Sequence, residues 1–81
     1  MNNINITPEL LKAVAIVKKS TMTRLYKDLG ICNYYSDSYL LKIVRGVKPV
    51  SHKFNVIVSD LICERLTTAE IIRAINLSKM L

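Results

Sequence analysis

The sequence predicts a small all-α domain built from five helices. Apolar residues recur at helical spacing in successive stretches, and residues that can cap a helix precede those stretches. No stretch alternates apolar and polar residues as a half-buried strand does, and glycine and proline interrupt the chain between stretches. Because the chain has 81 residues and no linker or repeat, we expect one domain, 1–81, with one core.

The first helix is predicted over residues 8–19. Thr7 can cap it, Pro8 suits its first position, and the charge of Glu9 lies favourably near the positive end of the helix dipole. The apolar residues are numerous enough to bury this helix on more than one side: Leu10, Leu11, Ala13, Val14, Ala15, Ile16 and Val17.

A short second helix follows, capped by Ser20 or Thr21. It ends at Gly30, because glycine readily adopts the left-handed turn that closes a helix. Its inner face is expected to comprise Leu25, Tyr26 and Leu29.

The third helix is predicted to begin at Asn33 or at Ser36, and the sequence favours neither cap. It stops at Gly46, and its inward residues are Leu40, Ile43 and Val44.

Ser51 is expected to cap the fourth helix. Residues 56–58 are β-branched and taken alone would suit a strand, but the capped helical stripe around them favours a helix. That stripe comprises Phe54, Ile57, Val58, Leu61 and Ile62.

Thr67 and Glu70 have the spacing of a capping box, which predicts a last helix over about 68–79. This helix is apolar over much of its circumference, so it is expected to pack on the domain or on a second copy of it. We therefore assign 67–81 as a C-terminal packing or dimerisation helix. The dimer interface is expected to comprise Ile72, Ile75 and Leu77.

The positive charge is concentrated in the middle of the chain. Lys and Arg number 12 against 6 Asp and Glu, and residues 18–53 hold eight of the former and two of the latter. A concentrated positive region attracts nucleic acid, since binding releases condensed counterions. We expect these cations to form one surface along a polyphosphate groove, although a solvated basic face without a partner is the alternative.

Two segments carry a family resemblance. Thr21–Ile31 resembles the first helix and turn of a helix-turn-helix unit, and Tyr39–Pro49 resembles the end of the recognition helix and the Gly…Pro loop after it. Together they are similar to the Cro/repressor-type (XRE-like) helix-turn-helix family over roughly residues 8–62. The resemblance implies a compact five-helix domain that binds operator DNA, commonly as a dimer.

The chain departs from that family's pattern in the first helix of the unit. Tyr26 stands where a small residue usually allows the two helices to cross closely, and Met22 stands where the family usually has a glutamine. If Ser36 is the cap, the connection between the helices is also longer than a turn of about 3–4 residues.

Lys42 and Arg45 are the leading candidates for DNA contacts, because such side chains bind guanine O6 and N7 or phosphate. A solvated helix face is the alternative role for these two residues, and ordinary capping is the alternative for Thr21, Thr23, Lys48 and Lys53. The other candidate contacts lie on the recognition helix, at its tyrosine-rich start, or near two helix starts: Thr21, Thr23, Tyr35, Ser38, Tyr39, Lys48 and Lys53. Tyr34 is expected to pack over a core edge or an interface, and the role of Tyr35 stays open.

No catalytic site is predicted. Cys32, His52 and Cys63 lack the paired spacing of a zinc site, the two glycines form no phosphate-cradling loop, and no acid–base pair stands out among the carboxylates. We expect no enzymatic activity, no metal and no cofactor.

The longest apolar run, Ala13 to Val17, is far shorter than the roughly 20 residues that span a bilayer. Met1 to Asn5 have no basic start that leads into a long apolar stretch, so we expect no secretory signal and no membrane partner. The sequence thus predicts a cytoplasmic protein with reduced thiols.

These observations predict a sequence-specific regulator of transcription that binds double-stranded DNA as a homodimer, of phage or mobile-element type. The alternative is a small protein-interaction module that inhibits a host protein or antagonises a repressor, using the tyrosines and the apolar last helix.

Overall fold

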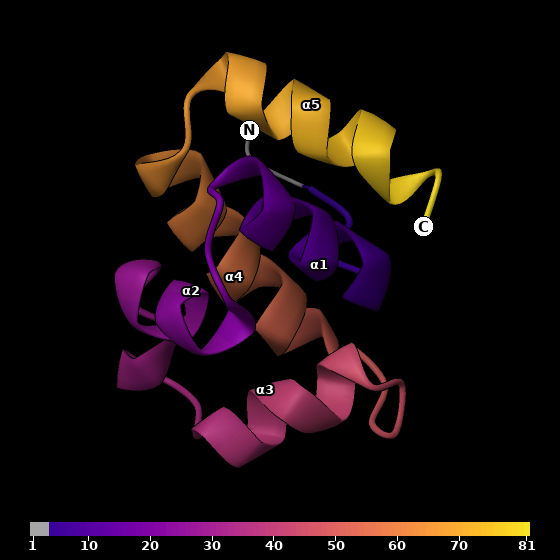
Figure 1. Ribbon diagram of the computed structural model, residues 1–81. Helices are drawn as coiled ribbons and strands as arrows, with labels where there is room; N and C mark the ends of the chain where they lie inside the picture. Colours follow the sequence, from indigo (N-terminus) through magenta and orange to yellow (C-terminus); the bar gives the residue numbers. More distant parts are fainter. Residues whose placement is uncertain (1–3) are drawn as a thin grey trace.

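A computed structural model describes residues 4–81, and in this part of the chain it contains helices and no strand (Figure 1). Residues 1–3, part of the stretch in which we expect no secretory signal, lie outside the described residues. The elements are α1 (Pro8–Val17), α2 (Met22–Asp28), the 3-10 turn η1 (Ile31–Asn33), α3 (Asp37–Val44), α4 (His52–Arg65) and α5 (Thr68–Ser78). The predicted all-α class with five α-helices is therefore confirmed.

Each α-helix begins at a Ser or Thr whose hydroxyl accepts a hydrogen bond from the backbone N–H three residues later. These caps are Thr7, Thr21, Ser36, Ser51 and Thr67. The structure thus selects Thr21 over Ser20 and Ser36 over Asn33. The helix α1 ends two residues earlier than predicted, because Lys19 turns the chain with a φ of 53°.

The helix α1 lies at the centre of the molecule, with α5 along one side of it and α4 behind it, while α3 lies at the far end (Figure 1). It packs against α5, α3 and α2, as its predicted burial on several sides requires. Ile16 is the exception at 55% exposed, since it shares the outer stripe of α1 with Glu9 and Lys12. The core comprises Ile6, Leu10, Leu11, Ala13, Val14, Ala15, Leu25, Leu29, Ile31, Leu40, Ile43, Phe54, Val58, Leu61, Ile62, Leu66 and Ala74.

The segment before α1 is held on α4 by two polar side chains. The amide of Asn55 accepts a hydrogen bond from the backbone N–H of Ile6 (2.7 Å) and donates one to the carbonyl of Ile4 (3.1 Å). The hydroxyl of Ser59 accepts from the backbone N–H of Ile4 (3.0 Å). These bonds satisfy backbone groups of an extended segment that has no strand to pair with.

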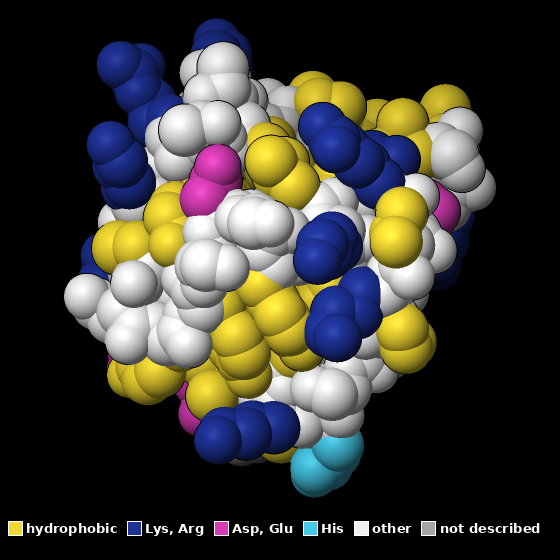
Figure 2. Space-filling view, turned by 90° about the horizontal axis from the view of Figure 1, so that it is seen from below, with side chains coloured by type: hydrophobic (Ala, Val, Ile, Leu, Met, Phe, Trp, Pro, Cys, Tyr) yellow, Lys and Arg dark blue, Asp and Glu magenta, His cyan; other side chains and the backbone are white. Residues whose placement is uncertain are grey.

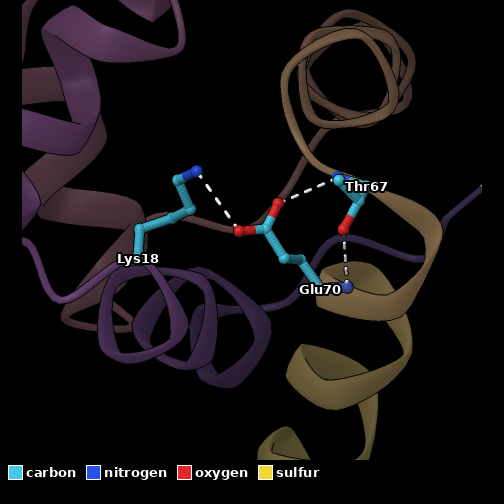
Figure 3. Close-up of polar contacts among 3 residues, drawn as sticks. All are labelled: Lys18, Thr67 and Glu70. Atoms are coloured by element: carbon cyan, nitrogen blue, oxygen red, sulfur yellow. Dashed lines mark hydrogen bonds and ion pairs between the residues drawn. The ribbon is translucent and has the colours of Figure 1, made fainter.

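Glu70 joins the start of α5 to the end of α1 (Figure 3). One carboxylate oxygen accepts from the backbone N–H of Thr67 at 2.9 Å, and the other lies 3.4 Å from the Nζ of Lys18. The predicted capping box of Thr67 and Glu70 is present. The Thr67 N–H lowers the pKa of Glu70 below its usual value, and the Lys18 ammonium lowers it further.

We expect Glu70→Gln to lower the urea midpoint at pH 7, by an amount that shrinks as the pH falls through the lowered pKa of Glu70. A lowered pKa means that folding favours the carboxylate. Its contribution to the free energy of unfolding is complete above the unfolded-state pKa and is lost as the pH falls through the folded-state pKa.

The control is Glu64→Gln, which removes an exposed carboxylate of α4. Urea unfolding of the three proteins between pH 7 and pH 3 tests the prediction. A difference between Glu70→Gln and the wild type that stays constant over this range would contradict it.

Candidate nucleic-acid interface

The helix α3 has an apolar face in the core and a polar face toward solvent. Leu40 and Ile43 are fully buried, whereas Ser38, Lys42 and Arg45 are exposed. The three exposed residues are four and three positions apart, so they share one side of the helix, opposite the buried pair. These are three of the residues predicted to contact DNA, and the structure brings them together.

The connection between α2 and α3 is longer than the usual turn. It begins at Leu29, passes through Gly30 in the left-handed region (φ 82°) and the η1 turn, and ends at the Ser36 cap. Arg65 of α4 supports this connection, since its Nη1 donates to the carbonyl of Asp28 at 2.7 Å. The connection is therefore longer than the turn of about 3–4 residues that joins the two helices of a helix-turn-helix unit.

Tyr26 of α2 holds the long connection in place through one hydrogen bond. Its hydroxyl donates to the backbone carbonyl of Tyr35 at 2.6 Å. Desolvation raises the pKa of Tyr26 above its ordinary value, and the negative forms of Cys32 and Asp37 raise it further. A neutral phenol is the form that can donate this bond, so the surroundings favour the donor state.

The rings of Tyr35 and Tyr39 are stacked, with centroids 4.7 Å apart and planes 15° apart. Both lie against the ring of Phe54 at the start of α4, at 5.1 and 5.9 Å. The Nζ of Lys48 lies 5.3 Å from the centroid of Tyr39. Burial raises the pKa of the Tyr35 phenol, and the neighbouring Tyr39 adds to the effect.

Tyr34 does not pack over the core edge, since it is 57% exposed, and its packing at an interface stays a prediction. Tyr35, left open from the sequence, packs over the core edge. The faces of Tyr35 and Tyr39 are therefore occupied by each other and by Phe54, which leaves their edges to meet a ligand.

The loop after α3 closes on the end of that helix. Gly46 is in the left-handed region (φ 77°), and the backbone N–H groups of Val47 and Lys48 both donate to the carbonyl of Lys42, at 2.9 and 3.2 Å. Lys48 is exposed on this loop, and Lys53 is exposed in the first turn of α4. The two remaining candidates lie at the start of α2, where Thr21 serves as the cap and Thr23 is exposed.

Figure 2 views the molecule from the side of α3. Lys and Arg side chains gather on the right of this face and lie at its left and lower margins, around a central area of apolar and neutral groups. Few acidic side chains interrupt them. This face therefore has a positive potential, as a surface that meets nucleic acid requires.

The expectation of a single cationic surface needs correction. Lys18, Lys19 and Arg24 line a pocket together with Arg65, at the C-terminal end of α4. Lys48 and Lys53 lie near the other end of that 14-residue helix, roughly 20 Å away. These cations are close in sequence but far apart in space, because the chain crosses the molecule through α2, α3 and α4 between them.

The three predicted dimer-interface residues do not share one face of α5. Ile72 is 54% exposed on the outer side, whereas Ile75 and Leu77 are half-buried and pack against the core. Ala74 is fully buried against α1, in the contact between α1 and α5. Ile75 and Leu77 lie on opposite sides of this contact. Only Ile72 is free to face a second molecule directly.

Cys32 is exposed and Cys63 is half-buried, and both are free thiols. Among residues 4–81, no three His, Cys, Asp or Glu side chains lie close enough to hold a metal ion. Within the same range, no helix has both the length and the apolar character that crossing a membrane requires.

Comparison with known proteins gives no relative: no family model, curated protein or solved structure matches the chain.

We expect Ser36→Ala to destabilise the protein by about 1 kcal/mol, because it removes the hydroxyl that caps the first turn of α3. The matched control is Ser38→Ala, the same substitution at an exposed position two residues later. Urea unfolding checks both variants. Equal stabilities for the two would show that the cap does not hold the start of α3.

Proposed function

We propose that this protein is a sequence-specific regulator of transcription that binds double-stranded DNA through the outer face of α3. The observation that carries the proposal is the division of α3 into two faces. Leu40 and Ile43 anchor it in the core, and Ser38, Lys42 and Arg45 project from the opposite side. A helix anchored in this way can enter a groove while its inner face stays packed in the core.

The dimensions suit the major groove. An α-helix with its side chains is about 10–12 Å in diameter, and the major groove is about 12 Å wide. In this proposal Arg45 and Lys42 bind guanine O6 and N7, and Ser38 bonds to a base edge or a phosphate.

Flanking groups would bind the DNA backbone. Lys48 and Lys53 follow α3 in the chain, and the backbone N–H groups at the start of α4 favour a phosphate there. Thr21 and Thr23 offer hydroxyl groups at the start of α2. Such contacts position the protein but do not read sequence.

The proposal includes a homodimer in the cytoplasm and a Cro/repressor-like role in a phage or mobile element. Ile72 would be central to a two-fold contact because it is the exposed member of the three α5 residues. Two copies of α3 one helical turn apart would then read two half-sites.

A second candidate function is a small protein-interaction module that inhibits a host protein or antagonises a repressor. Exposed apolar side chains on α1, on α5 and in the two residues at the end of the chain favour it: Ile16, Ile72, Met80 and Leu81. Salt dependence separates the two functions, since duplex binding weakens steeply with salt and an apolar contact does not.

We expect the double variant Lys42→Ala/Arg45→Ala to lose sequence preference and to bind its preferred duplex more weakly. The expected penalty is roughly 1–3 kcal/mol for each side chain that no longer binds a base. The preferred duplex comes from a selection among random sequences at two salt concentrations. Fluorescence anisotropy then gives the affinities.

The control is Lys12→Ala/Lys79→Ala, which removes the same charge from the outer stripe of α1 and the end of α5. It should keep the sequence preference. If the two double variants bind every duplex equally, or if the wild type binds no duplex at low salt, the assignment of α3 as the reading helix fails.

A further inference from the structure

A basic pocket lies away from α3, where the C-terminal ends of α1, α2 and α4 meet. Its volume of about 400 Å³ falls within the range of small-molecule sites. Four cationic side chains and one carboxylate line it: Lys18, Lys19, Arg24, Arg65 and Asp28. We propose that this pocket binds a small phosphorylated anion.

The side chain of Arg65 is held at the pocket by a backbone group. Its Nη1 donates to the carbonyl of Asp28 at 2.7 Å. Its Nη2 lies over Gly30, where a Cβ would come within 3.6 Å of it. A guanidinium has five N–H donors in a planar fork, so others remain for two oxygens of one phosphate group.

Lys19 lies in the turn between α1 and α2 with a φ of 53°, a conformation that a glycine would adopt more easily. The backbone N–H of Ser20 donates to the carbonyl of Ala15 at 2.8 Å and closes this turn. The strained backbone thus places a lysine at the pocket where local stability favours glycine. Such strain is found at functional sites.

The other lining charges differ in what they contribute. Lys18 is directed toward Glu70, at 3.4 Å, so part of its charge is already neutralised (Figure 3). Arg24 and Asp28 are four residues apart on one flank of α2, and the Asp28 carboxylate opposes an anion. Lys19, Arg24 and Arg65 therefore supply the positive charge, which suits a diphosphate group better than a singly charged anion.

A free anion fits this pocket better than the DNA backbone does. The pocket is concave and lies at the end of α4 opposite Lys53, roughly 20 Å from it, whereas the DNA-binding surface proposed above lies along α3. The anion site does not rest on that proposed function.

The test is isothermal titration of the whole protein with inorganic pyrophosphate, at low ionic strength and without other phosphate or sulfate. We expect Lys19→Gly and Arg24→Ala each to weaken binding about tenfold. Asp28→Asn should tighten it several-fold, because it removes the opposing charge but keeps the carbonyl that holds Arg65. Lys12→Ala, which removes an exposed lysine elsewhere on α1, should bind as the wild type does.

Lys19→Gly has a second readout, because glycine suits a positive φ. Its thermal midpoint without ligand should equal or exceed that of the wild type, so weaker binding cannot be ascribed to unfolding. Absence of pyrophosphate binding by the wild type overturns the proposal. So does a weakening in Lys12→Ala equal to that in Lys19→Gly.

Titration of the same variants with duplex DNA separates the two sources of phosphate. If pyrophosphate does not bind but Lys19→Gly weakens duplex binding, the pocket serves the DNA backbone and the proposal is wrong. If pyrophosphate binds as expected while no duplex binds, the anion site stands and the proposed function of α3 fails.

Discussion

Burial of Leu40 and Ile43 is the constraint on which the position of α3 depends. These two side chains pack one face of the helix in the core, so the opposite face can carry polar groups. A single anchoring face still allows a helix to tilt. The ring of Tyr39 limits that motion, because it is stacked on Tyr35 and both rings rest on Phe54 of α4. The outer residues of α3 are thus held by contacts made on its inner side and at its start.

The long connection before α3 does not leave that helix loose. The hydroxyl of Tyr26 holds the carbonyl of Tyr35, and Arg65 holds the carbonyl of Asp28 at the other end of the connection. A small residue at position 26 would leave the carbonyl of Tyr35 without this donor. The bulky tyrosine therefore helps to hold the long connection in place.

Local chemistry made much of the fold predictable from the sequence. Thr7 and Thr67 precede helical stripes with acidic residues in the first turn, so their helix starts follow from nearby residues. The choice between Asn33 and Ser36 does not, since both can cap, and the contacts that hold Tyr35 before the helix include Tyr26 and Phe54, which lie outside this segment of the chain. The packing of Tyr35 over the core edge did not follow from the sequence for the same reason, because an irregular segment has no periodicity to mark its buried side. The bond from Arg65 to Asp28 joins residues 37 apart, and a basic residue in a last turn is typical of ordinary dipole compensation.

Lys18 belongs both to the basic pocket and to the ion pair with Glu70. Its ammonium lies at the edge of the basic pocket and also beside Glu70, whose carboxylate caps α5. An anion in the pocket and the carboxylate of Glu70 would compete for the same positive charge. The charge of Lys18 helps to hold Glu70 ionised. Occupation of the pocket would therefore weaken the ion pair that joins α1 to α5. The apolar contact between these helices around Ala74 would still keep them together. The apolar contact contributes more to stability than the ion pair does, since it excludes water along α1. The ion pair is about one-third exposed, at 37% and 26% for its two side chains.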